Sequence, residues 1–187
     1  MISFNFFQQK SLKTEYSFFN GLAGGKLLFT SLIDMLEAKV SPEFADEVIV
    51  EANLTNDGAY TAVGYYPFEE MQKIVGILVQ KTGKSANDLL RDFGYYLFGK
   101  LSTVHGDVLA GADDVLHMLE YLDGDIHVQV RKLYPDADLP RFTVISRTDS
   151  TMRLRYYSER ELYPLAEGLM DGAAHYFDCE LERETHQ

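Results

Sequence analysis

Apolar residues recur at helical spacing through most of the first 133 positions of the chain. Segment 27–40 places its leucines and a methionine on one face, which predicts an amphipathic helix there. The same period, together with start and stop signals, predicts four further helices over 42–53, 69–83, 85–104 and 113–133.

The pattern changes after residue 140. Segment 141–158 alternates like extended chain and predicts two strands around a turn at 148–150. Helical spacing returns in 162–177, which predicts a final helix. Helices followed by a hairpin and one more helix indicate the α+β class.

The chain has 187 residues, enough for one domain with a sizeable core. The periodic pattern begins only after a group of glycines at 21–25, so residues 1–23 are predicted to be an N-terminal extension of unknown role. The domain itself is predicted to occupy residues 24–187.

Charge and composition exclude several classes of protein. The net charge of −12 opposes binding to nucleic acid or to an anionic membrane surface. Apolar runs are too short for a membrane span, and the N-terminus lacks the features of a signal peptide. The single cysteine, Cys179, rules out an intrachain disulfide and fits a reducing compartment. We therefore expect a cytoplasmic protein that neither binds nucleic acid nor inserts into a membrane.

A run of hydrogen-bond donors ends the second predicted strand. Tyr156, Ser158 and Arg160 alternate along the chain, and residues two apart in an extended segment project to the same face. Two hydroxyls and a guanidinium on one face can hold a group with several anionic oxygens. The alternative is a surface strand leading into a helix, with Ser158 as the N-cap.

His127 lies just upstream, next to Ile126 on an apolar helical face. A neutral imidazole in that setting can ligate one axial position of a metal in an apolar cavity. A haem needs such a ligand, apolar walls, and donors for two propionates. His127, the leucine-rich helices and the donor run supply these three requirements, whereas the sequence contains no phosphate loop, paired-cysteine zinc site or GxSxG elbow.

These segments resemble the haem nitric oxide/oxygen-binding (H-NOX) domain, which is related to the sensor domain of soluble guanylate cyclase. The resemblance extends from about residue 26 to 180 and rests on KLLFTSLIDML, DLLRDFGYYLFGKL, IHVQVRKLYPDADLPRF, LRYYSER and EGLMDGAAHYF. It implies an N-terminal helical part, followed by a helix-plus-antiparallel-sheet part that encloses haem b (iron protoporphyrin IX).

The resemblance also implies the roles of individual residues. His127 matches the proximal iron ligand, and Tyr156, Ser158 and Arg160 match the motif that binds the propionates. Pro140 matches the proline that presses on the porphyrin. His105 lies outside the matching segment and is interpreted as structural or exposed.

The distal pocket governs the choice of gas. Oxygen-binding members use a tyrosine hydroxyl as a donor, and Leu165 occupies the matching position here. Tyr163 is two residues away and should point elsewhere on a helix. The other matching pocket positions are Leu28, Leu32, Leu97 and Leu101.

An apolar pocket predicts a non-catalytic sensor that binds NO and CO but forms no stable oxygen complex. By resemblance, its partner in trans is a histidine kinase or a cyclic-di-GMP enzyme. The alternatives are an oxygen-binding sensor with Tyr163 or another donor in the pocket and a haem-free interaction module. Family members usually add a strand pair after the last helix, so the C-terminal strands are predicted to be truncated and the sheet to lack an edge.

Overall fold

The molecule has two halves in space. One is built of helices, and the other combines a four-stranded sheet with further helices. The computed structural model describes residues 2–8, 22–54, 68–133, 139–158, 160 and 162–186. The helical half contains α1 (Leu22–Lys39), α2 (Pro42–Ala52), α3 (Phe68–Thr82) and α4 (Ala86–Val104). The other half contains β1 (Ile2–Gln8), α5 (Gly106–Leu109), α6 (Val115–Glu120), the π-turn η1 (Leu122–Ile126), α7 (His127–Leu133), β2 (Arg141–Arg147), β3 (Thr151–Tyr157), α8 (Tyr163–Tyr176) and β4 (Leu181–His186). The predicted α+β class is confirmed.

Local signals in the sequence define the helix ends. Ser85 is the N-cap of α4, and its hydroxyl accepts a hydrogen bond from the Asp88 amide at 3.1 Å. Ser41 caps α2 in the same way, accepting from the amide of Phe44 at 3.2 Å. Gly83 adopts a φ of +70° just after α3, a conformation that glycine reaches without strain.

The segment predicted as one helix over 113–133 is interrupted, and this prediction is wrong. The amides of Asp125 and Ile126 both bond to the carbonyl of Tyr121, at 2.9 and 3.2 Å, which widens the helix into η1. α6 ends before this turn and α7 begins after it, at His127.

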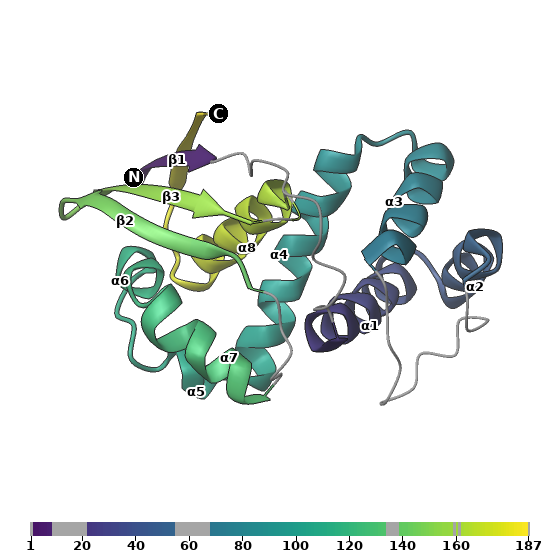
Figure 1. Cartoon of the computed structure of the whole chain (residues 1–187), viewed down its shortest axis with the longest axis horizontal. Helices are drawn as coiled ribbons and strands as arrows, with labels where there is room; N and C mark the ends of the chain where they lie inside the picture. Colours follow the sequence, from purple (N-terminus) through teal and green to yellow (C-terminus); the bar gives the residue numbers. More distant parts are fainter. Residues whose placement is uncertain are drawn as a thin grey trace, which may run out of the picture.

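The sheet has the order β2-β3-β1-β4. β2 and β3 form the predicted antiparallel hairpin, while β1 runs parallel to both β3 and β4. β1 therefore comes from the segment predicted as an extension, and it lies between the hairpin and β4 (Figure 1). β4 is an edge strand of this sheet, whereas the sequence predicted that an edge strand would be missing. The predicted boundary at residue 24 and the predicted C-terminal truncation stay predictions.

Helix α4 joins the two halves of the molecule (Figure 1). One buried cluster fills the space among α1, α2, α3 and α4, and includes Phe29, Ile74 and Phe93. A second cluster lies between α6, α8 and the sheet, and includes Leu116 and Leu154. α4 contributes side chains to both clusters, so it fixes the position of one half relative to the other.

α4 and α8 approach each other at backbone distance. A Cβ added to Gly168 would lie 2.0 Å from the carbonyl oxygen of Arg91, and one added to Gly94 would lie 2.2 Å from that of Leu165. Neither backbone can give way without separating the helices. Glycine at these two positions is therefore what permits the close packing.

Gly168→Ala is expected to lower the free energy of unfolding by about 3 kcal/mol, because the methyl group overpacks a contact formed by backbone. Gly99→Ala is the matched control, since it lies in α4 with nothing within 4 Å of an added Cβ. Removing a helical glycine there should raise stability by about 0.5–1 kcal/mol. Urea unfolding of both variants measures the difference, and equal midpoints would contradict the close packing.

Candidate functional site

A cavity of about 230 Å³ lies between the two halves of the molecule. Its lining side chains come from α1, α4 and α8, from the segment between α5 and α7, and from β2 and β3. Most of the wall is hydrocarbon: Leu27, Leu28, Leu97, Phe98, Leu101, Leu109, Met118, Leu119, Leu122, Ile126, Val130, Leu139, Phe142, Leu162, Leu165, Ala166, Leu169 and Met170. The cavity suits a largely apolar molecule with a small number of polar groups.

His127 lies on this wall as the first residue of α7 and is 7% exposed. Its Nδ1 is 2.9 Å from Oδ1 of Asp123, so a neutral ring donates its Nδ1 hydrogen to the carboxylate. Nε2 then remains as the lone-pair nitrogen available to a metal. Burial is the largest effect on the ring and lowers the pKa of His127 below its usual value, although Asp123 acts in the opposite direction.

Asp123 was not singled out by the sequence, yet both of its oxygens are used. Oδ2 accepts a hydrogen bond from the backbone amide of Phe142 at 2.8 Å. The Phe142 ring in turn lies 5.9 Å from that of His127 and 5.4 Å from that of Tyr156. An aspartate four residues before a ligand histidine was the available signal, because ligating imidazoles usually donate their second nitrogen to such a group.

The run from Tyr156 to Arg160 also reaches the cavity. Tyr156 is 2% exposed on the inward face of β3, whereas Ser158 follows the end of that strand. The Ser158 hydroxyl accepts from the amide of Arg160 at 3.2 Å, so the chain turns within the run. The three side chains line one cavity, together with Pro140, although they do not share one extended face.

The alternative role for Ser158 as a helix N-cap is wrong. α8 begins at Tyr163 with Leu162 as its N-cap residue, and no side chain caps it. Pro164 in the first turn favours this start, because proline has no amide hydrogen to satisfy and its φ suits a helix.

Four of the five predicted distal leucines line the cavity: Leu28, Leu97, Leu101 and Leu165. Leu32 does not. It lies one turn further along α1 than Leu28, and it is 3% exposed within the cluster among the first four helices. Among the α1 side chains that the structure describes, Leu27 and Leu28 line the cavity, whereas the turn that carries Leu32 packs against its neighbouring helices.

Tyr163 is absent from the cavity wall, and its hydroxyl accepts a 3.3 Å hydrogen bond from the side-chain amide of Asn87. His105 differs from expectation, because it lies at the end of α4 on the cavity wall. Ser102 lies beside it there, and its hydroxyl donates to the carbonyl of Gly99 at 3.0 Å. His105, interpreted from the sequence as structural or exposed, is thus a second imidazole on the cavity lining.

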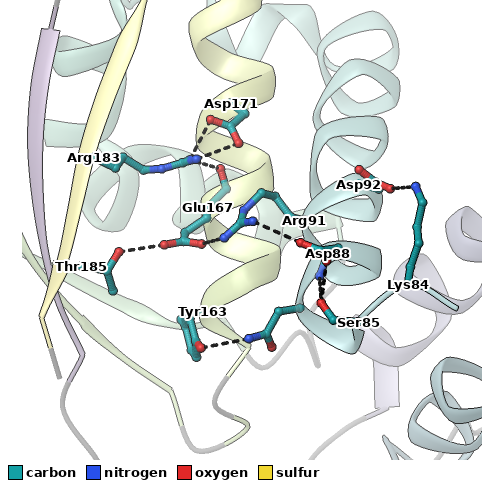
Figure 2. A network of polar contacts seen from close by, with 11 residues as sticks. Lys84, Ser85, Asp88, Arg91, Asp92, Tyr163, Glu167, Asp171, Arg183 and Thr185 are labelled. Carbon is teal, nitrogen blue, oxygen red and sulfur yellow. Dashed lines mark hydrogen bonds and ion pairs between the residues drawn. The ribbon is translucent and has the colours of Figure 1, made fainter. Parts of the chain in front are cut away.

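A polar network links α8 to α4 and β4 (Figure 2). Glu167 is 4% exposed and accepts from Arg91 of α4 at 2.6 Å and from Thr185 of β4 at 2.8 Å. Arg183 of β4 donates to the Glu167 carbonyl at 2.7 Å and to Asp171. The pKa of Arg91 is raised, chiefly by its hydrogen bond to Glu167. Helix α8, which carries Leu165 to the cavity, is therefore held from α4 and from β4.

Within the described residues, no group of three or more His, Cys, Asp or Glu side chains could hold a bare metal ion. The cavity instead combines a single buried imidazole with apolar walls and a tyrosine, a serine and an arginine. These features suit a largely apolar cofactor that carries its own metal and anionic groups.

Comparisons with known proteins indicate a family that binds a cofactor of this kind. A model of the Haem-NO-binding family matches residues 25–185. The Fe(II) unliganded H-NOX protein from K. algicida is 33% identical with a TM-score of 0.76, over 82% of this chain and 83% of that chain. The S. oneidensis H-NOX protein in the Fe(II)NO ligation state is 30% identical with a TM-score of 0.75, over 82% of this chain and 84% of that one. An H-NOX from Shewanella woodyi in the Fe(II)CO ligation state is 35% identical with a TM-score of 0.69, over 82% and 80%. No curated protein matches the chain.

The chain therefore belongs to the Haem-NO-binding, or H-NOX, family. H-NOX domains bind haem and are gas sensors that are not catalytic themselves. None of the helices in the described parts of the chain has the length and apolar character that crossing a bilayer requires.

Proposed function

We propose that this H-NOX protein is a haem b sensor that binds NO, and also CO, at ferrous iron and signals to a separate effector protein. The observation that carries the proposal is a single cavity with His127 on one wall and Leu165 on a hydrocarbon wall contributed by other elements. Bound haem would supply a ferrous iron that takes up a diatomic gas.

The residues present fit that cofactor. His127 offers Nε2 to the iron, since its Nδ1 bonds to Asp123. Tyr156, Ser158 and Arg160 supply donors for the propionates, and a guanidinium bound to a carboxylate gives the strongest of these contacts. Pro140 on the same wall would press on the porphyrin. The leucines of α1, α4 and α8 enclose the remaining apolar surface.

The choice of gas depends on the hydrogen-bond donors near the bound gas molecule. Leu28, Leu97, Leu101 and Leu165 offer only hydrocarbon, and the Tyr163 hydroxyl bonds to Asn87 outside the cavity. Bound oxygen carries partial negative charge and depends on a donor, whereas NO binds ferrous haem strongly without one. This composition favours NO and CO over oxygen.

Signalling would begin at His127. If His127 released the iron, α7, whose first residue it is, would be free to move, and the contact at Pro140 would be relaxed. A sensor must differ between its two states at a surface that a partner contacts. The partner proposed by resemblance is a histidine kinase or a cyclic-di-GMP enzyme in trans.

Absorption spectra of the purified ferrous protein test the proposal. A five-coordinate spectrum with NO, a CO complex, and no stable complex in air are the expected results. Formation of a stable oxygen complex would overturn the gas assignment. A protein without a Soret band after reconstitution with haem would instead favour the haem-free interaction module.

An oxygen-binding sensor is the second candidate, and His105 is the observation that favours it. This imidazole lies on the cavity wall and can donate a hydrogen bond. If the wild-type protein holds oxygen in air and His105→Leu abolishes the complex, His105 is the hydrogen-bond donor to oxygen. The protein is then an oxygen sensor and not an NO-selective one. Persistence of the oxygen complex in His105→Leu would exclude that role.

Leu165→Tyr is expected to convert the protein into one that holds oxygen. The new hydroxyl would supply the donor that the hydrocarbon wall lacks, and a hydrogen bond to a charged partner contributes about 1.5–3 kcal/mol, or roughly 10- to 150-fold in oxygen affinity. Leu165→Phe is the matched control, because it adds the ring without the hydroxyl. Oxygen titration of the ferrous variants measures the change, and equal affinities in the two variants would contradict the assignment of Leu165.

Arg160→Ala is expected to weaken haem retention by roughly 10-fold or more, because a charge-assisted contact to a propionate is lost. The preference for NO over oxygen should stay unaltered. Arg155→Ala is the control, since Arg155 is exposed on β3 of the same hairpin and is absent from the cavity wall. Haem transfer to apomyoglobin gives the retention. An altered gas preference would show that Arg160 acts on the distal side.

A further inference from the structure

Asp123 connects the proposed iron ligand to the sheet through its two carboxylate oxygens. Oδ1 is 2.9 Å from Nδ1 of His127, and Oδ2 is 2.8 Å from the backbone nitrogen of Phe142 in β2. We propose that Asp123 is a positioning residue that strengthens the bond from His127 to iron and couples rupture of that bond to the edge strand β2. This inference rests on the proposed function.

The local backbone is built for this contact. η1 spans Leu122–Ile126, so the π-turn contains Asp123 and ends directly before His127. Single π-turns inserted in helices frequently occur at functional sites. The interrupted helix thus has a reason: its wider turn carries a carboxylate that reaches both His127 and β2.

The charge of Asp123 acts on the chemistry of His127. A carboxylate that accepts the Nδ1 hydrogen makes the imidazole more basic, so Nε2 becomes a stronger ligand. In a low-dielectric surrounding this hydrogen bond is strong, and His127 is largely buried. Asp123 would therefore oppose release of the iron by His127 and set how readily NO produces it.

The second carboxylate oxygen of Asp123 connects this contact to β2. Phe142 follows Pro140 by two residues and lies in β2, which is an edge strand of the sheet. Its ring also lies beside the rings of His127 and Tyr156. If His127 and α7 move away, either the bond from Asp123 to His127 breaks or the bond from Asp123 to the Phe142 amide does. The second outcome releases the Phe142 amide in a strand at the edge of the sheet, where a partner protein can bind.

Resonance Raman spectra of the ferrous, gas-free holoprotein test whether Asp123 strengthens the bond from His127 to iron. Asp123→Asn and Asp123→Ala should lower the iron–histidine stretching frequency, and the conversion to the five-coordinate form by NO should accelerate by about 10-fold. Asp125→Asn is the matched control, because Asp125 is an exposed residue of the same π-turn and its substitution removes the same charge. A purely structural role for Asp123 would leave the stretching frequency of folded Asp123→Asn at the wild-type value.

Hydrogen exchange of the Phe142 amide tests whether rupture of that bond is coupled to β2. This measurement uses the wild-type protein, so it does not depend on the folding of a variant. We expect this amide to be protected in the ferrous protein and to exchange faster after NO is added. Unchanged protection would overturn the coupling, and an unchanged iron–histidine frequency in Asp123→Asn would overturn the effect on the bond. Failure of the wild-type protein to bind haem would instead refute the proposed function, which makes the two failures distinguishable.

Discussion

His127→Gly is expected to abolish the iron–histidine band of the ferrous protein and to lower haem affinity by more than about 100-fold. Loss of a group that only supports a ligand typically costs 10- to 100-fold in metal affinity, so loss of the proposed ligand should cost more. The apolar walls and the propionate donors remain, so imidazole added to the solution should enter the vacated space and restore the band. Haem titration and resonance Raman spectra, with and without imidazole, measure both effects.

His117→Gly is the matched control for this prediction. His117 is also a partly buried helical histidine with an aspartate four residues earlier, and its Nδ1 lies 3.6 Å from the carboxylate of Asp113. It lies outside the cavity wall, however, so its loss should cost about 1 kcal/mol of helix stability and leave haem affinity unchanged. Equal loss of haem in the two variants would show that the histidines act through folding. Full retention of the iron–histidine band in His127→Gly would point to His105 as the ligand.

Features encoded over a few neighbouring residues could be predicted from the sequence. The N-cap at Ser85 and the helix end at Gly83 depend on local backbone chemistry, so their residue types sufficed. The hairpin of β2 and β3 follows from alternation around a turn. Residue type and spacing also singled out His127 and the run from Tyr156 to Arg160, and the structure places the side chains of His127, Tyr156, Ser158 and Arg160 on the lining of one cavity.

Features that depend on contacts between distant segments could not be predicted in this way. The π-turn before His127 is accompanied by a carboxylate that bonds to Phe142, nineteen residues away from it. Leu32 has the periodicity of a wall residue, yet how far α1 extends along the cavity is set by packing against other helices. His105 reaches the wall because α4 ends beside the cavity. Helical period shows which face is buried but not what that face contacts.

β1 is the largest such difference. Its residues were interpreted as an extension because they show no helical period and the family resemblance begins after them. The structure gives them a central position in the sheet, with six register pairs to β3 and six to β4. Pairing of this kind depends on a partner about 150 residues later in the chain, which local patterns do not encode.

Deletion of residues 1–8 is expected to remove on the order of 5 kcal/mol from the free energy of unfolding, a large part of the stability of a typical domain. Among the described strands β4 pairs with β1 alone, so loss of β1 leaves β4 attached through side chains such as Arg183 and Thr185. β3 would keep its pairing with β2 but present an unpaired edge, and each buried backbone group left without a partner costs about 1–3 kcal/mol. An exposed edge also promotes association between copies. Urea unfolding and size-exclusion chromatography at several concentrations measure the two effects.

Asn5→Pro and Asn5→Thr separate the ladder of β1 from any other consequence of the deletion. Proline removes the amide hydrogen at the centre of the strand, whereas threonine keeps it and favours extended chain. We expect Asn5→Pro to reproduce most of the loss seen on deletion and Asn5→Thr to reproduce none of it. Haem affinity provides a further distinction, because β3 delivers Tyr156 to the cavity and pairs with β1 up to that residue. If β1 only extends the sheet, stability falls while haem binding survives; if β1 also fixes the end of β3, both fall together. Wild-type stability in both Asn5→Pro and the deletion would show that the hairpin, α8 and β4 hold the sheet without β1.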